Sequence, residues 1–185
     1  MSRKIDEAKK EAIKQAVYEL TMEEGLVALS MGKVAKRAQV SPATLYIYYK
    51  DKTDMLSRIY EGVKDIMDDG LPEKLAKLDN LDDKLRVAVH HFILRFRENT
   101  SAAQFMWAIQ NNLGIIDQVA CDYAEQKSAD VLELFKEMLN NPDYENMSLL
   151  LASSLFEIPY TLQTRGATDS ELEEAIEILI KAFKK

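Results

Sequence analysis

The sequence predicts an all-α protein, and three observations support this fold class. Chain breakers are scarce, with four prolines and six glycines among 185 residues. Between these breaks, apolar residues recur mostly at steps of three and four, which is the spacing of an amphipathic helix. Serine and threonine residues that can act as N-caps stand where several apolar stripes begin. The one strand-like stretch, residues 44–49, is short and lies among helix signals.

Signals for three helices occupy the first fifty residues. An apolar stripe over residues 5–20 predicts the first helix, and Gly25 offers its C-cap. Ser30 is a candidate N-cap for a short second helix. Ser41 followed by Pro42 is the start signal of a third helix. Proline lacks a backbone N–H, and at the first helical position that group would have no partner within the helix.

The rest of the chain predicts further helices. Asp51 or Thr53 can begin a long one, which Gly70-Leu71-Pro72 interrupts. Residues 168–171, TDSE, form a capping box before the last helix. The remaining helical segments are residues 80–97, 101–109, 115–139, 145–165 and 169–184, with breaks at Gly114, Asn140-Asn141-Pro142 and Gly166.

The composition suits a globular protein and excludes several other classes. Apolar residues make up 47% of the chain, enough for a hydrophobic core and too many for a disordered protein. The single cysteine, Cys121, excludes a disulfide scaffold and a cysteine-built zinc site within one chain. No stretch approaches the ~18 uninterrupted apolar residues of a membrane span. Residues 1–7 are charged where a signal peptide turns apolar, so we expect a cytoplasmic protein without a membrane partner.

Charge is distributed unevenly along the chain, whose formal net charge is −7. Residues 1–64 contain 12 Lys and Arg against 9 Asp and Glu, a surplus of 3 positive charges. Residues 65–185 contain 12 against 22, a surplus of 10 negative charges. Such an asymmetry points to nucleic acid or a membrane surface as the partner of the basic end.

Residues that could perform catalysis or bind a metal form no recognisable set. No Ser/His/Asp nucleophile pattern, glycine-rich phosphate loop or pair of catalytic carboxylates can be placed. His90 and His91 are the only histidines, and adjacent helical positions point about 100° apart, so the two cannot chelate one ion. We therefore expect no enzyme, no metal site and no cofactor.

The segment from Ser30 to Lys52, SMGKVAKRAQVSPATLYIYYKDK, predicts a helix-turn-helix. It describes two short helices across a tight turn at Gln39-Val40, followed by a cap and a longer helix. The two short helices can share a small apolar core made of Val34, Ala35, Val40 and Leu45.

Residues 34–56, VAKRAQVSPATLYIYYKDKTDML, resemble the tetracycline-repressor (TetR) family of one-component bacterial regulators. The family pattern is I-A-x-x-A-G-V-S-x-x-T-L-Y-x-Y-F-x-x-K-x-x-L, and the run VSPATLY followed by a tyrosine and Lys52 is the specific part of the match. The resemblance implies a three-helix helix-turn-helix DNA-binding domain over residues 1–50. It also implies a helical bundle over residues 51–185 for effector binding and dimerisation, in which residues 51–70 form a connecting helix.

The sequence departs from this pattern at two positions. Gln39 stands where the pattern has the turn glycine, at a site that we expect to need a positive φ. Tyr49 replaces a phenylalanine, and its ring should still fill the core if the hydroxyl reaches water or a polar partner. Neither change removes a group that the resemblance assigns to DNA.

The resemblance implies two kinds of DNA contact. Contacts to phosphate, which fix the position of the protein without reading sequence, fall to Ser30, Lys33, Ser41, Tyr48 and Lys52. Contacts in the major groove fall to Pro42, Ala43, Thr44 and Tyr46. The proline and the alanine have no hydrogen-bonding side chain, so they would read apolar features such as thymine methyl groups.

A purely structural interpretation of several of these residues stays open. Ser30 and Ser41 could be helix caps only, and Tyr46 and Tyr49 could both be core residues. We expect Lys36 and Arg37 to form a solvated face rather than specific contacts.

Aromatic residues are frequent in the centre of the chain and come from several predicted helices. Pockets in helical bundles lie between helices and are apolar with few polar groups. Together with the resemblance, this predicts a cavity for a largely apolar or aromatic effector, lined by Phe92, Phe96, Trp107, Gln110, Asn111, Tyr123 and Phe156. For each residue taken singly, ordinary core packing is the alternative.

Residues 145–165 and 169–184 are predicted to form the interface of a homodimer. Apolar residues spread around most of the first segment, so it must be buried on more than one side. We thus expect a homodimeric transcription regulator, specifically a repressor that a small-molecule effector releases from double-stranded operator DNA. The alternative is a helical interaction protein that has kept the fold and lost DNA binding.

Overall fold

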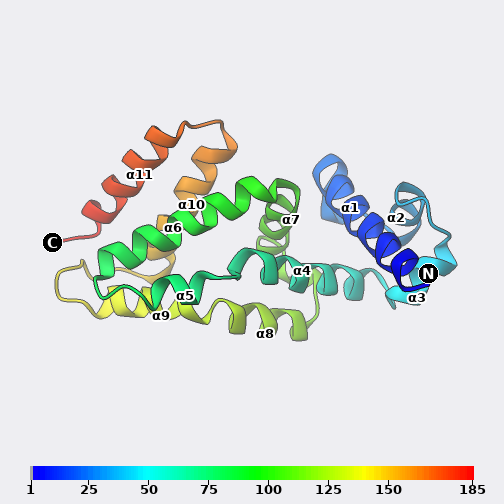
Figure 1. The fold of residues 1–185 in the computed structure, drawn as a ribbon, viewed down its shortest axis with the longest axis horizontal. Coiled ribbons are helices and arrows are strands. Elements are labelled where there is room, and N and C mark those ends of the chain that lie inside the picture. Colours follow the sequence, from blue (N-terminus) through cyan, green and yellow to red (C-terminus); the bar gives the residue numbers. More distant parts are fainter. Residues whose placement is uncertain (1) are drawn as a thin grey trace. The chain divides into compact units, whose positions relative to one another are not determined.

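The computed structural model describes the chain from residue 2 onward and its side chains from residue 7 onward. The first residue of the predicted apolar stripe, Ile5, therefore has its side chain outside the described residues. The secondary structure of residues 2–185 is helical apart from one isolated bridge between Tyr144 and Lys184 (Figure 1). The all-α prediction is confirmed. None of the described helices is long and apolar enough to cross a membrane.

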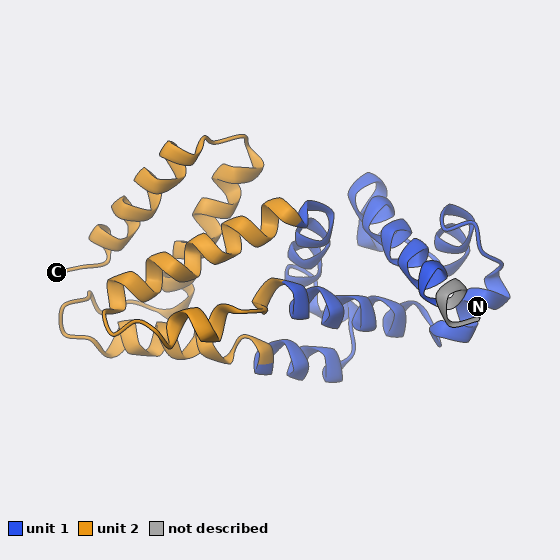
Figure 2. Ribbon diagram, viewed as in Figure 1, with its two compact units in different colours: residues 1–66, 99–126 blue, residues 67–98, 127–185 orange. Residues whose placement is uncertain are grey.

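The chain divides into two compact units, each assembled from two stretches of sequence (Figure 2). Unit 1 comprises the residues up to Ile66 together with Asn99–Gln126. Unit 2 comprises Met67–Glu98 and Lys127–Lys185. The helices of unit 1 are α1 (Ser2–Ala28), α2 (Met31–Arg37), α3 (Pro42–Tyr48), most of α4 (Lys52–Asp68), α7 (Thr100–Gln110), the short 3-10 helix η1 (Leu113–Ile115) and α8 (Gln118–Lys127).

Helix α1 contributes a large part of the buried core of unit 1. Its buried stripe includes Ile13, Val17 and Leu20, as the sequence spacing predicts. On the same helix, Tyr18 packs against Phe105 of α7 with ring centroids 5.4 Å apart. Gly25, the expected C-cap, has φ 79° and produces a kink inside α1, after which residues 26–28 form a last turn.

The turn between α2 and α3 is a Schellman motif, a helix ending closed by two backbone hydrogen bonds. The Val40 amide donates to the Ala35 carbonyl at 3.0 Å, and the Gln39 amide donates to the Lys36 carbonyl at 3.3 Å. This geometry needs a left-handed residue directly after the helix C-cap Ala38, and Gln39 at that position has φ 55°. The predicted positive φ at Gln39 is confirmed.

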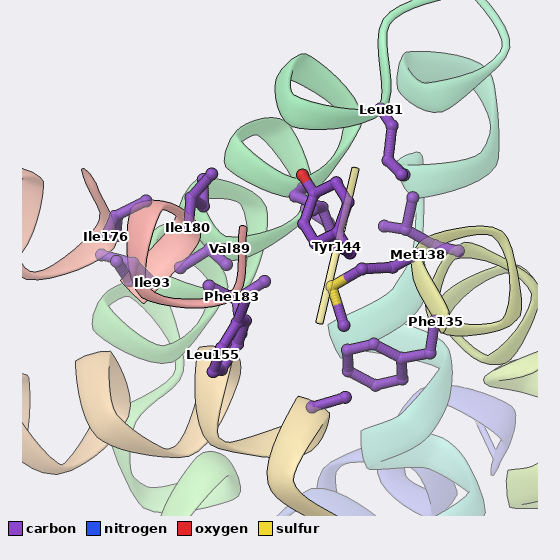
Figure 3. Close-up of a cluster of buried hydrophobic side chains, with 14 of the residues drawn as sticks. Leu81, Val89, Ile93, Phe135, Met138, Tyr144, Leu155, Ile176, Ile180 and Phe183 are labelled. Carbon is purple, nitrogen blue, oxygen red and sulfur yellow. The ribbon is translucent and has the colours of Figure 1, made fainter. Parts of the chain in front are cut away.

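Unit 2 is a bundle around one apolar core. Its helices are α5 (Leu71–Leu75), α6 (Leu81–Glu98), α9 (Ala129–Asn140), α10 (Leu149–Thr164) and α11 (Asp169–Ala182). Figure 3 shows how side chains from α6, α9, α10 and α11 point toward one another. Fully buried members of this core include Leu85, Met138, Leu155 and Ile176.

Two predicted segments differ from the observed helices. Residues 115–139 form two helices, α8 and α9, with a break at Ser128, because the two halves are buried in different units. The segment predicted over residues 145–165 becomes helical only at Leu149, where the Ser148 hydroxyl accepts the Leu151 amide. The capping box before α11 is confirmed, with Thr168 and Glu171 bonding to each other's backbone amides.

Replacing Gln39 with glycine should stabilise unit 1. Glycine adopts a positive φ without the steric cost that a Cβ atom carries, so we expect Gln39→Gly to raise the free energy of unfolding by about 0.5–1 kcal/mol. Urea unfolding followed by circular dichroism measures the change. Gln39→Ala keeps the Cβ atom and serves as the control, which should not gain stability. A lower unfolding midpoint for Gln39→Gly would contradict this account of the turn.

Candidate nucleic-acid interface

Helices α2 and α3 are held together by a small apolar core. Val34, Ala35 and Leu45 are each at most 1% exposed. Val40 in the turn is half-buried beside them. Since both helices are only seven residues long, this core and the turn fix the orientation of α3.

The outward face of α3 carries the residues predicted to meet the major groove. Pro42, Ala43 and Tyr46 are exposed, and Thr44 is half-buried. Tyr46 is 56% exposed, so the structure rules out the core alternative for this residue. Ile47, which the sequence analysis did not single out, lies on the same face and is 77% exposed.

Both serines of the motif act as N-caps. The Ser30 hydroxyl accepts the Lys33 amide at 3.4 Å, and the Ser41 hydroxyl accepts the Thr44 amide at 3.0 Å. The Ser41 and Thr44 hydroxyls are also 2.8 Å apart. Because both serines are exposed, each hydroxyl retains room for a second polar partner at the surface.

Tyr48 and Tyr49 lie at the end of α3 with ring centroids 6.5 Å apart. Both rings are half-buried, so Tyr49 fills part of the core as expected for its position. Burial, and then the nearby charge of Asp54, raises the pKa of the Tyr49 hydroxyl. The ammonium group of Lys10 from α1 lies 5.8 Å from the centre of the Tyr48 ring, within the range of a cation–π contact.

Lys52 holds the end of α1 in place. Its ammonium group donates to the carbonyl oxygens of Leu26 at 2.7 Å and Val27 at 3.3 Å. These carbonyls belong to the last turn of α1, just beyond the kink at Gly25. The side chain is half-buried, and loss of hydration lowers the pKa of its ammonium group. Two of its three N–H groups are engaged with the protein, which leaves the third for another acceptor.

The other cations of the motif are paired with acids of α1. The Lys33 ammonium contacts the Glu24 carboxylate and donates to the Ala28 carbonyl at 3.0 Å. Arg37 donates to Glu23 at 2.6 Å and to Glu19 at 2.9 Å. Arg37 therefore links α2 to α1 through ion pairs at the surface, and the expectation that it makes no specific contact to DNA stays a prediction.

A polar cluster that sequence reasoning missed joins α4 to the start of α8. The Arg58 guanidinium donates to both carboxylate oxygens of Asp117, at 2.9 and 2.6 Å. The Asp117 amide donates to the Ser57 hydroxyl at 2.9 Å, and its carboxylate accepts the Ala120 amide, which lowers the pKa of the Asp117 carboxyl. Further along, the Tyr123 hydroxyl donates to Asp65 at 2.6 Å. No local signal connects residues 59 positions apart.

Comparison with known proteins places this site in a family. Residues 13–59 match the family model described as bacterial regulatory proteins, tetR family. Residues 13–59 are a TetR-family domain. The match runs from residue 13 within α1 to the first half of α4, which includes the whole helix-turn-helix.

Two uncharacterized HTH-type transcriptional regulators of Bacillus subtilis are similar to part of this chain. YxbF is 28% identical over 90 residues, which are 48% of this chain and 24% of YxbF. YdeS is 39% identical over 51 residues, which are 28% of this chain and 26% of YdeS. The matched stretch therefore spans only about a quarter of either relative.

Solved structures extend the similarity of fold to the whole chain. A TetR family transcription regulator from Marinobacter aquaeolei has a TM-score of 0.81 at 22% identity and covers 99% of each chain. A TetR-family regulator from Haemophilus influenzae has a TM-score of 0.72 at 21% identity and covers 100% of each chain. LfrR from Mycobacterium smegmatis, solved in complex with proflavine, has a TM-score of 0.63 at 17% identity and covers 96% of this chain and 98% of that chain.

The residues predicted to line the effector cavity fall in both units, outside the TetR-family domain. In unit 2, Phe92 lies 5.9 Å from Phe96 and 5.5 Å from Phe156, measured between ring centroids. Trp107 and Tyr123 belong to unit 1 and are half-buried there. The effector cavity stays a prediction.

Three of the residues predicted to line that cavity have polar side chains that could bind an effector, and each has its own local surroundings. Asn111 donates from Nδ2 to the Trp107 carbonyl at 2.8 Å and so bonds to the end of its own helix. Gln110 is exposed at the last position of α7. The Tyr123 hydroxyl is bonded to Asp65. An effector that used Asn111 or Tyr123 would have to displace or share these bonds.

Removing the ammonium group of Lys52 should destabilise the TetR-family domain. Lys52→Met keeps a long side chain and leaves the Leu26 and Val27 carbonyls without their donor, so we expect a loss of about 1–2 kcal/mol in the free energy of unfolding. Urea unfolding measures this loss. The exposed neighbour Lys50 provides the matched control, since Lys50→Met removes an equal charge and should change stability by less than about 0.5 kcal/mol. Equal stability of the two variants would disprove the contact.

Proposed function

We propose that the protein is a TetR-family transcription regulator, specifically a repressor that binds operator DNA as a homodimer and leaves it when a small molecule binds. The observation that carries this proposal is the helix-turn-helix with an exposed, uncharged face on α3. Helices α2 and α3 are seven residues long, share a three-residue core and have their N-caps at the surface. This arrangement suits insertion of α3 into the major groove. The similarity of residues 13–59 to the tetR family supports the same function.

Phosphate contacts would come from the rim of this face. Ser30 and Ser41 offer exposed hydroxyls, and Tyr48 lies at the end of α3. Lys52 keeps one N–H group for a phosphate oxygen, whereas Lys33 would exchange its bond to Glu24 for one. Pro42, Ala43, Thr44 and Tyr46 would face the bases.

Release by an effector requires that the ligand bind two conformations with different affinities. In a dimer, movement of α4 changes the separation of two α3 helices, which must match half-sites about 34–36 Å apart or a multiple of that distance. The Arg58–Asp117 pair and the Tyr123–Asp65 bond connect α4 to α8 and would pass such a movement on. The complex of the structural neighbour LfrR with proflavine supports an aromatic effector for this chain as well.

The dimer would be built from the uncovered apolar faces of α10 and α11. Leu150 is 80% exposed, Leu151 is 52% exposed and Ile158 is 40% exposed on α10, and Ile178 is 57% exposed on α11. Leu155 lies in the segment predicted to form the interface, but it is fully buried in the core of its own unit, so the prediction is wrong for this residue. Thus α10 is apolar on two sides, and only one of these is covered in unit 2. A matching helix pair from a second copy would cover the other.

Binding to duplex DNA tests the proposed function directly. With operators selected from random duplexes, Lys52→Ala should weaken binding to all sequences alike and lower the slope of log affinity against log salt concentration by about one. Thr44→Ala should instead alter the preference between operators. The titrations are run at a temperature well below the thermal unfolding midpoint of each variant, so that every variant is folded. Lys136→Ala on α9 is the control, and its slope should not change.

Absence of salt-dependent binding to any duplex would favour the alternative of a helical interaction protein without DNA binding. Unchanged affinity and salt dependence in Lys52→Ala would instead show that this lysine does not contact phosphate.

Charges on the uncovered side of α10 should separate the dimer. Leu151 and Ile158 lie seven residues apart on one side, so Leu151→Glu combined with Ile158→Glu should give folded monomers that lose operator affinity. Sedimentation velocity reports the mass, and circular dichroism reports the fold. Leu155→Glu should unfold unit 2 instead, and Val119→Glu, at a 64% exposed site on α8, should leave the dimer intact. Sedimentation of the unmodified protein as a monomer at micromolar concentration would refute this interface.

A further inference from the structure

The outward face of α3 is an apolar stripe at helical spacing. Ala43 and Ile47 lie one turn apart, and Pro42 and Tyr46 lie one turn apart beside them. None of the four carries a charge, and the Tyr46 hydroxyl is the one hydrogen-bonding group among their side chains. Ile47 is 77% exposed, although Leu45 two positions earlier is fully buried.

Single exposed apolar residues are common on protein surfaces and need no explanation. Ile47 is different because it continues a stripe on the element that the proposed function inserts into DNA. A partner that covers this stripe must present apolar groups to it. In the major groove, the one apolar group on a base edge is the C5 methyl group of thymine.

We propose that Ile47 determines operator specificity by contacting the C5 methyl group of a thymine in each half-site. The proposal rests on the proposed function and adds a residue and a chemical group to it. The stripe contains none of the side chains that form two hydrogen bonds to a purine edge, which are arginine, lysine, asparagine and glutamine. The apolar surface of Ile47 can therefore select thymine, whereas it offers a purine edge or the amino group of cytosine no hydrogen bond.

Removing single methyl groups from the operator tests this contact. Operators are selected from random duplexes with the unmodified protein, and each thymine of a half-site is replaced in turn by deoxyuridine, which lacks only the methyl group. One replacement should weaken binding by the unmodified protein about fourfold, the equivalent of burying one methyl group. The same replacement should leave binding by Ile47→Ala unchanged, because the side chain that covered the methyl group is gone.

Two controls keep the result specific to Ile47. Val119→Ala removes a 64% exposed apolar side chain on α8 and should keep the full fourfold dependence on the methyl group. Thermal unfolding should show that Ile47→Ala stays folded, since the site is exposed and alanine favours helix. A selection with Ile47→Asn should shift the preferred base at this position toward adenine, which asparagine bonds in two places.

Two results would overturn the proposal. One is an Ile47→Ala protein as sensitive to every deoxyuridine replacement as the unmodified protein. The other is a selected half-site without thymine. In both cases selective, salt-dependent binding would remain and the proposed function would stand, whereas an unmodified protein that selects no duplex would refute the proposed function itself.

Discussion

The bond from Lys52 to the last turn of α1 joins the two helices that flank the helix-turn-helix in sequence. The carbonyls of Leu26 and Val27 lie in that last turn, just beyond the kink at Gly25, and the Lys52 ammonium at the start of α4 binds both. Because α2 and α3 lie between these two anchor points in sequence, their short core and their turn are held at both ends. A helix-turn-helix of two seven-residue helices has little stability of its own, so it depends on this closure.

The same domain illustrates why a surplus of positive charge does not by itself make a DNA-binding surface. Lys33 is paired with Glu24, and Arg37 is paired with Glu19 and Glu23. These pairs are at the surface, where an ion pair contributes little to stability, and under the proposed function they would compete with phosphate for the same cations. The face that remains for base contact is uncharged, so sequence preference would come from shape and apolar contact more than from charge.

Polar groups join α4 to the start of α8. Asp117, the residue before α8, binds Arg58 and Ser57 of α4, and hydrogen bonds of this kind have defined geometries. Under the proposed function, such a geometry would pass a shift of α4 on to α8.

Local features could be read from the sequence because each is settled within a few residues. The caps at Ser30, Ser41 and Thr168 bond to amides three positions ahead, and the positive φ at Gln39 follows from the turn pattern. Helix content and most helix breaks follow from spacing and from proline and glycine in the same way.

Contacts between distant residues were decided only by the tertiary structure. The partners of Lys52 are 25 and 26 positions away, and Asp117 is 59 positions from Arg58. The apolar pattern of α10 predicted two buried sides but not which one faces its own core, and only the structure separates the fully buried Leu155 from Leu151, which is 52% exposed. The break at Ser128 has the same cause, because α8 and α9 are buried against different units and periodicity records only that a face is buried, not what covers it.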